Sequence, residues 1–229
     1  MAKFVISKSK VLEQYKILEG LGDIISYSSK TNQEITKILE KETKCLFSVH
    51  LTNELVHIKN KPRVIFLSQG WNDKLIKDLL SDGVRHFIVD NEPDLDVLES
   101  VLEKRDEKVV VFLRVKLRER SLRTERYFVF GIGAEVVNKR IISLSEKFKD
   151  HVSLGIHFHR KTQNMSEWNL QYGLENMLDK EVLEIIDFIN IGGGIPSEYA
   201  NTNIDVLDSI FKKIEELKSW VNGFGVKLM

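Results

Sequence analysis

Three short stretches of the sequence carry residues that can do chemistry, and each follows or ends an apolar run typical of a buried β-strand. Lys30 follows IISYSS, and three consecutive glycines follow FINI. His157 and His159 end the run VSLGIHFH. A lysine amine can attack a carbonyl, an imidazole can stack on a flat ring or transfer a proton, and glycine N–H groups can surround an anion.

The elements that must position these residues are predicted to be eight strands alternating with helices. Apolar residues in the segments between the strands fall three and four positions apart, as on one face of a helix. The predicted strands are residues 23–29, 45–51, 63–68, 84–89, 108–115, 152–159, 188–192 and 226–229. The predicted helices are residues 32–42, 52–59, 72–83, 92–105, 135–150, 167–186 and 202–221, preceded by a leading helical segment at 4–20.

Repeats of strand and helix predict an α/β fold with parallel strands and crossover helices. Eight repeats in 229 residues favour a closed (β/α)8 TIM-type barrel that occupies residues 1–229 as a single domain. The last predicted strand, VKLM, also ends the sequence. We therefore expect a barrel cut at its eighth strand, unless the leading helix replaces the missing one.

Composition excludes several classes of function. Lys plus Arg equals Asp plus Glu at 34 each, which gives no support for a nucleic-acid or membrane-surface role. The single cysteine, Cys45, permits no internal disulfide and indicates a reducing, cytoplasmic compartment. No apolar run is long enough to span a membrane, and the first ten residues lack the apolar core of a signal peptide.

In such barrels the active site lies at the carboxyl ends of the strands. The residues at those ends are therefore expected to lie together at one open end of the barrel, its mouth. Lys30 follows the first predicted strand, His50 lies near the end of the second with Glu54 just beyond, and Arg114 lies near the end of the fifth. His159 ends the sixth. Cations and imidazoles therefore dominate the expected mouth.

Gly192, Gly193 and Gly194 lie where the seventh strand ends, in INIGGGIP. Without a Cβ, glycine lets the backbone N–H groups turn toward an anion at close range. The loops after strands seven and eight are the recurrent phosphate site of these barrels. A tight turn that needs positive φ explains the same glycines, so both interpretations stay open.

The two histidines of HFH point to the same side of their strand and could hold a metal. No Cys, Asp or Glu completes a ligand set in the loop, and the next residues, Arg160 and Lys161, are cationic. We therefore expect no metal and favour an anionic ligand. For His157, packing in the barrel mouth is an equally open interpretation.

A lysine, a flat imidazole and a phosphate-binding loop in one mouth are what pyridoxal phosphate requires. Lys30 would form the covalent bond with the cofactor's aldehyde, and an imidazole would stack on its ring. The glycine loop would hold its phosphate. Lys30 alone would be read as an ordinary surface lysine, so the hypothesis rests on the combination.

These residues resemble the barrel domain of the alanine-racemase-fold (fold type III) decarboxylases, which act on ornithine, diaminopimelate or arginine. YSSKTN is similar to their YAVKAN, LFSVHLTNEL to FDVASxxEL, FLRVK to LRI, GIHFHRKTQ to GIHCHIGSQ, and INIGGGIP to LDIGGGFP. The similar segments occur in the family's order along nearly the whole chain. The ordered set is more specific than any one of them.

The resemblance implies a pyridoxal-phosphate-dependent amino-acid decarboxylase with a basic amino acid or diaminopimelate as substrate. Lys30 and His159 are then the catalytic residues, with Lys30 bonded to the cofactor and His159 stacked on its ring. Arg114 is the barrel arginine that helps to bind the cofactor. Thr162 donates its hydroxyl to the phosphate, which also lies against the three glycines.

Several positions depart from the family pattern. The aspartate of FDVAS is Ser48 here, and the following Ala-Ser is His50-Leu51. The Ser-Lys that precedes FG in the family is Phe128-Val129, and the Gly-Ser after the stacking histidine is Lys161-Thr162. Lys161 either adds charge to the phosphate site or blocks a close approach.

In the family, the last strand leads into EPGR, whose glutamate binds the ring nitrogen and whose arginine helps to bind phosphate. A β-domain then supplies a catalytic cysteine and completes a dimeric site. Because this sequence stops before these parts, we expect the barrel portion of a longer, homodimeric enzyme. The 229 residues alone are not expected to decarboxylate at ordinary enzyme rates.

Two other hypotheses remain. The chain could be a stand-alone carrier or regulatory protein that binds pyridoxal phosphate on the same barrel without turnover. It could also be a phosphate-ligand barrel without pyridoxal phosphate, in which Lys30 bonds to a sugar phosphate. The ordered similarity to the decarboxylases speaks against the last hypothesis.

Overall fold

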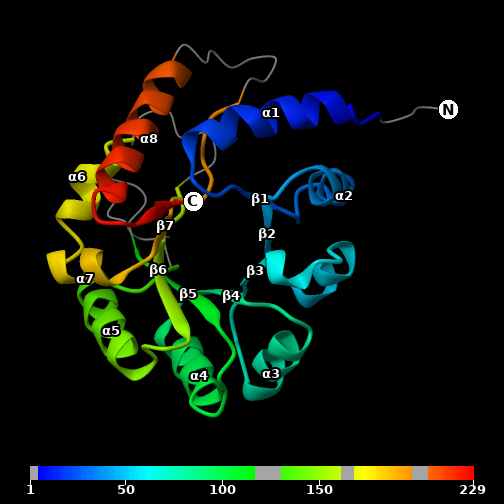
Figure 1. Ribbon diagram of the computed structural model, residues 1–229. Coiled ribbons are helices and arrows are strands. Elements are labelled where there is room, and N and C mark those ends of the chain that lie inside the picture. The colour runs from blue at the N-terminus through cyan, green and yellow to red at the C-terminus, as the bar shows by residue number, and fades with distance from the viewer. Residues whose placement is uncertain (1–4, 117–129, 161–167, 198–205) are drawn as a thin grey trace.

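Eight parallel strands form one sheet in which each strand pairs with the next along the chain. The computed structural model describes residues 5–116, 130–160, 168–197 and 206–229 (Figure 1). The strands are β1 Ser26–Ser28, β2 Leu46–Val49, β3 Val64–Leu67, β4 His86–Val89, β5 Val109–Arg114, β6 Val152–His157, β7 Phe188–Asn190 and β8 Lys227–Leu228. The prediction of eight parallel strands in a TIM-like α/β barrel is confirmed.

Helices surround the strands (Figure 1). They are α1 Lys8–Leu21, α2 Gln33–Glu42, α3 Asp73–Ser81, α4 Glu92–Leu102, α5 Ala134–Lys147, α6 Leu170–Glu175, α7 Lys180–Ile185 and α8 Leu207–Asn222, with short 3-10 helices η1 Thr52–His57 and η2 Lys61–Arg63. Two of the helices predicted from the sequence differ in detail from the observed ones. The helix predicted at 52–59 is a 3-10 helix, and the one predicted at 167–186 is divided because Asp179 adopts an extended conformation.

Asparagine side chains begin three of the helices soon after a strand ends. Asn32, Asn72 and Asn91 accept hydrogen bonds from backbone N–H groups in the first turns of α2, α3 and α4, at 2.9–3.0 Å. Each cap satisfies an N–H group that the helix itself leaves unpaired. The chain can therefore turn from strand to helix within a few residues, which keeps the strand-end residues at the mouth.

The sheet curls until its last strand meets the segment before its first. The backbone N–H groups of Asp23 and Ile24 both donate to the carbonyl oxygen of Leu228, at 2.8 and 3.1 Å. The N–H of Leu228 donates in return to Oδ2 of Asp23 at 2.8 Å, and Lys218 pairs with Oδ1 at 3.3 Å. These bonds join β8 to the start of β1.

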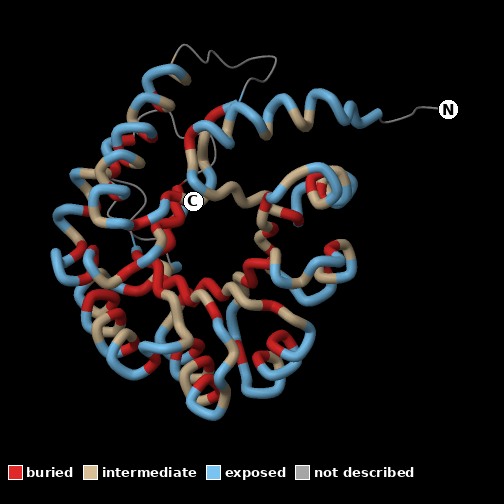
Figure 2. Tube along the Cα trace, viewed as in Figure 1, coloured by how far each residue is buried: buried red, intermediate tan, exposed pale blue. Residues whose placement is uncertain are grey.

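Apolar side chains fill both faces of the sheet. The larger core lies between strands and helices, and buried residues follow the strands and the helix sides that face them (Figure 2). A separate cluster of Ile65, Ile88 and Phe112 lies on the inner face. A Cβ on Gly155 would lie 2.6 Å from the Phe112 ring, so a glycine is required beside it. The interior is therefore a packed core.

Replacing Asp23 by alanine should lower the free energy of unfolding by about 1–2 kcal/mol, because the N–H of Leu228 loses its acceptor. Asp23→Asn keeps an acceptor oxygen and loses only the exposed pairing with Lys218, so its effect should be smaller. Urea unfolding followed by circular dichroism measures both. Equal destabilisation of the two variants would show that the hydrogen bond from the N–H of Leu228 to Asp23 does not stabilise the fold.

Candidate active site

The predicted site residues that the structure describes lie at or just beyond the carboxyl ends of strands. Side chains two residues apart share a face of a strand. Phe112 lies in the inner cluster, so Arg114 continues that inner face, and the ladder pairs Arg114 with His157. On the other side of the mouth, Leu46 packs against the inner cluster, so His50 projects inward four residues later.

Lys30, His50, Arg114 and His159 lie within electrostatic range of one another. Burial is the main cause that lowers the pKa of His50, to about 4, followed by the charges of Lys30, His159 and Arg114. Burial also lowers the pKa of His159, followed by Arg114 and Lys30. Both imidazoles are therefore neutral near pH 7. Lys30 itself is exposed and open to a ligand.

His157 differs from its neighbours in being fully enclosed. Burial, and then Arg114 and His159, lower its pKa to about 3. It is 4% exposed, which agrees with the interpretation of His157 as a histidine packed beneath the mouth. A ligand at the mouth would meet His50 and His159 instead.

Arg114 is held in place by a carboxylate that we did not single out from the sequence. Its Nη1 lies 2.7 Å from Oδ1 of Asp90, which is almost wholly buried and directly follows β4. Gln69, just after β3, donates to the other oxygen of Asp90, and the guanidinium lies 5.1 Å above the ring of Phe130. An acidic residue at a predicted strand end was the signal available for Asp90.

The glycine loop is fixed by its contact with the end of β6. The N–H of Gly193 donates to Nδ1 of His159 at 3.2 Å, and the N–H of Gly192 donates to Oδ1 of Asn190 at 2.8 Å. Gly192 has φ 64°, and a Cβ there would lie 2.5 Å from the carbonyl oxygen of Phe158. A close approach therefore requires glycine at 192, while a phosphate contact stays a prediction.

Glu54 supports the neighbouring strand end. Its side chain is buried, and Oε1 accepts the backbone N–H of His50 at 3.3 Å. Arg160 is also buried, and its guanidinium stacks 3.7 Å from the ring centre of Trp168. Arg160 thus packs against an aromatic ring. Its charge also contributes to the lowered pKa of His159.

Some predicted positions lie outside the described residues. They are Thr162, Lys161, Phe128 and Val129. In the described part of the chain, no group of three or more His, Cys, Asp or Glu side chains comes close enough together to hold a metal. No helix in those ranges is both long and apolar enough to cross a membrane.

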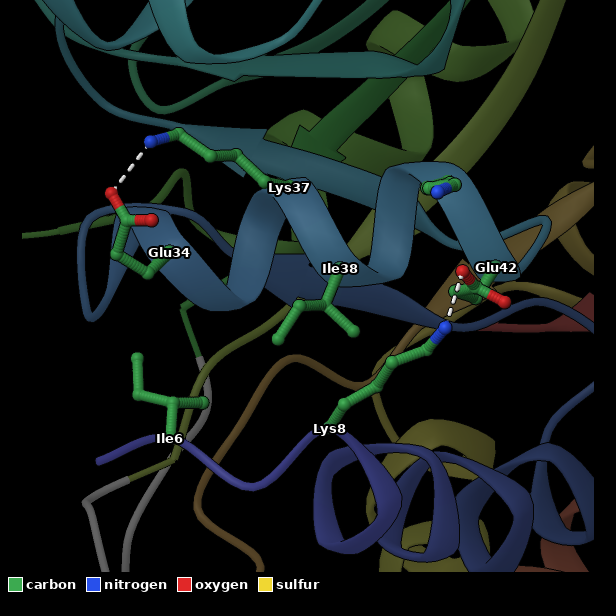
Figure 3. Close-up of a pocket in the computed structure, with 7 residues that line it drawn as sticks. Ile6, Lys8, Glu34, Lys37, Ile38 and Glu42 are labelled. Atoms are coloured by element: carbon green, nitrogen blue, oxygen red, sulfur yellow. Dashed lines mark hydrogen bonds and ion pairs between the residues drawn. The ribbon is translucent and has the colours of Figure 1, made fainter.

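A separate cavity of about 400 Å³ lies on the flank of the barrel, between α2 and the segment that leads into α1 (Figure 3). Ile6 and Ile38 form its apolar part. Four of its charged side chains pair with one another, Lys8 with Glu42 at 2.7 Å and Lys37 with Glu34 at 2.6 Å. No predicted site residue within the described ranges lines it.

The residues at the mouth fit a ligand that combines a carbonyl group, a flat ring and an anion. Lys30 offers an amine, and the neutral imidazole of His159 offers a flat face held by Gly193. Arg114 adds a cation whose position is fixed by Asp90. Gly192 and Gly194 have φ of 64° and 101°, so the loop folds in a way that side chains disfavour.

Replacing Arg114 by glutamine should raise the pKa of His157 and His159, because removing a positive charge makes each imidazolium less costly. The pKa of His50 should rise less, because burial, Lys30 and His159 each lower that pKa more than Arg114 does. Glutamine keeps a donor for Asp90. NMR titration of the imidazoles measures the change.

The matched control is Arg140→Gln, which removes an arginine that pairs with Glu99 and Asp96 on the outer helices. It should leave these three pKa values unchanged. Equal changes in both variants would contradict a shared mouth.

Comparison with known proteins identifies the family. A family model described as "Pyridoxal-dependent decarboxylase, pyridoxal binding domain" matches residues 18–227. A curated protein of Staphylococcus aureus (strain NCTC 8325 / PS 47), 2-[(L-alanin-3-ylcarbamoyl)methyl]-2-hydroxybutanedioate decarboxylase, is 26% identical over 209 residues, covering 83% of this chain and 52% of that protein. The chain thus spans about half the length of this relative.

Solved structures share the fold. Lysine/ornithine decarboxylase of Vibrio vulnificus aligns with a TM-score of 0.71 at 19% identity, covering 96% of this chain and 60% of that one. Diaminopimelate decarboxylase of Helicobacter pylori aligns with a TM-score of 0.73 at 17% identity, covering 96% and 59%. Since the family model spans nearly the whole sequence, the chain belongs to the pyridoxal-dependent decarboxylases through its pyridoxal-binding domain, and its cofactor is pyridoxal phosphate.

Proposed function

We propose that the chain is the cofactor-binding barrel of a pyridoxal-phosphate-dependent amino-acid decarboxylase, a carbon–carbon lyase. The observation that carries this proposal is the convergence of Lys30, Arg114 and His159 on one mouth in a chain of this family. Relatives of known structure are named for lysine, ornithine or diaminopimelate. We accordingly propose a basic amino acid or diaminopimelate as substrate.

Pyridoxal phosphate, when bound, supplies a ring that takes up the electron pair left when the substrate carboxylate departs as carbon dioxide. In our proposal Lys30 provides the amine that condenses with its aldehyde. Lys30 is exposed two residues after β1 ends, so both the aldehyde and an incoming amino acid can reach it.

His159 is proposed to stack on the cofactor ring. Its Nδ1 accepts a hydrogen bond from Gly193, so the neutral ring carries its proton on Nε2 and its plane is fixed. The lowered pKa of His159 keeps the imidazole uncharged, so it adds no further positive charge to the mouth. A neutral flat face suits a cationic pyridinium ring.

Arg114 and the glycine loop are proposed to hold the polar edges of the cofactor. The ion pair with Asp90 fixes where the guanidinium lies and leaves its other nitrogens to a ligand. Gly192, Gly193, Gly194 and Thr162 are proposed to contact the phosphate. We further propose that the complete enzyme is a homodimer, as the family resemblance implies.

A carrier that binds pyridoxal phosphate without turnover is the second candidate. The feature that favours it is Ser48, which stands where the family pattern has aspartate. Its hydroxyl lies 2.8 Å from that of Ser26 on β1, so a neutral pair occupies this place. Measurement of turnover separates the two candidates.

Borohydride reduction of the protein with pyridoxal phosphate should fix a pyridoxyl group on Lys30, because a hydride traps the bond between an amine and the aldehyde. Peptide mapping by mass spectrometry locates the label. Lys30→Arg keeps the charge and should remove the label. A label on Lys161, or none, would contradict the assignment.

Carbon dioxide release distinguishes decarboxylase from carrier in the same preparation. The panel contains lysine, ornithine, arginine, diaminopimelate and the substrate named for the Staphylococcus aureus relative. Release that depends on Lys30 supports the decarboxylase. Because the 229 residues alone are not expected to reach ordinary enzyme rates, slow release still counts for the decarboxylase. Labelling of Lys30 with no release above that of the Lys30→Arg variant supports the carrier.

Gly193→Val should weaken the binding of pyridoxal phosphate about tenfold or more, equivalent to one good hydrogen bond. A Cβ on Gly193 would lie 3.2 Å from Cε1 of His159, so the larger valine displaces that ring. Fluorescence titration measures the dissociation constant. Gly133→Val is the control, since a Cβ there meets nothing within 4 Å.

A further inference from the structure

His50 is the residue of the mouth that the proposed function leaves without a role. The family pattern FDVAS has alanine at this position, a side chain that cannot hydrogen-bond. Here an imidazole projects inward from the end of β2. Its side chain is half-buried, so part of the imidazole remains open to the mouth of the barrel.

His50 and Lys30 follow two strands that pair with each other, β2 and β1. The register pairs Ser26 with Leu46 and Ser28 with Ser48, an offset of 20 residues. The bond from the N–H of Ser29 to the carbonyl oxygen of Ser48, at 3.0 Å, continues the pairing beyond β1. Extended past the ends of β1 and β2, the same offset brings Lys30 beside His50, and the charge of Lys30 acts on the His50 imidazole.

No fixed partner holds the imidazole of His50 among the described residues. Its Nδ1 is shielded from solvent and has no hydrogen-bond partner there. Only the backbone is anchored, through the bond from its N–H to Glu54. Burial and the nearby cations keep the ring neutral, so one nitrogen donates and the other accepts.

We propose that His50 is a cofactor-binding residue that donates a hydrogen bond to the ring hydroxyl oxygen of pyridoxal phosphate. This inference rests on the proposed function of Lys30. The ring hydroxyl is on the carbon next to the one that bears the aldehyde. A group bonded to Lys30 therefore carries its hydroxyl oxygen close to the residue beside Lys30.

The position of His50 separates this contact from the phosphate site. His50 directly follows β2, whereas the glycine loop follows β7, on the far side of β1 and β8 around the barrel. The hydroxyl oxygen readily loses its proton and then carries negative charge. A neutral imidazole N–H stabilises that charge without adding another cation beside Lys30 and Arg114.

The test compares pyridoxal phosphate with its 3-deoxy analogue, which lacks only the ring hydroxyl. His50→Ala should weaken pyridoxal phosphate about tenfold, as for loss of a hydrogen bond to a charged oxygen. The same variant should bind the analogue as the unchanged protein does. His50→Leu, which fills the space of the imidazole without hydrogen-bonding, should match His50→Ala.

Two further variants serve as a rescue and as a control. His50→Gln keeps a donor and should recover most of the affinity, and His151→Ala removes a half-buried histidine at the opposite end of the barrel without effect. Equal losses for both ligands, or no loss for either, would overturn the role of His50. Failure of the unchanged protein to carry a borohydride label on Lys30 would instead overturn the proposed function, and this inference with it.

Discussion

The register of the parallel strands determines which side chains reach the mouth of the barrel. Because side chains alternate, a slip by one residue would turn every inward group outward. The pairing of β5 with β6 is held by the inner core, where the ring of Phe112 occupies the space that a side chain on Gly155 would need. Two residues further along the same strands, this register sets Arg114 beside His157.

Charge organises the mouth that the register creates. Arg114 is the cation that affects all three of its histidines, and Asp90 fixes it. Removing Arg114 would leave the buried carboxylate of Asp90 without compensation, which in fully buried pairs costs about 3–5 kcal/mol. The pair therefore constrains where the guanidinium lies, whatever it adds to net stability. Burial, and after it the charge of Arg114, lowers the pKa of each histidine and keeps the imidazoles neutral.

Periodicity in the sequence was enough to predict the eight strands and their parallel order. The predicted strands were too long, since Asp23 and Ile24 bond to Leu228 ahead of β1 instead of pairing with β2. Local pattern also missed the break between α6 and α7, where Asp179 restarts the helix. Such details depend on contacts between distant segments, which spacing along the chain does not encode.

The location of Lys30, Arg114 and His159 near strand ends was predictable, because in each case residue type and strand end coincide, whereas their roles toward a cofactor stay a prediction. Asp90 met the same criterion, but its importance lies in a bond to a residue 24 positions away. The hydrogen bond from Gly193 to His159 joins segments 34 residues apart and was equally hidden. Sequence therefore gives the members of the mouth more readily than the bonds between them.

Binding of phosphate, as proposed, would place two competing demands on the N–H groups of the glycine loop. Gly193 already donates to a neutral imidazole nitrogen, and Gly192 to an amide oxygen. A neutral hydrogen bond contributes about 1 kcal/mol, whereas one to a charged oxygen contributes about 1.5–3 kcal/mol. A doubly charged phosphate would thus outcompete His159 for the N–H of Gly193. The imidazole would then lose the bond that fixes its plane, so stacking on a ring would have to replace that bond in orienting it.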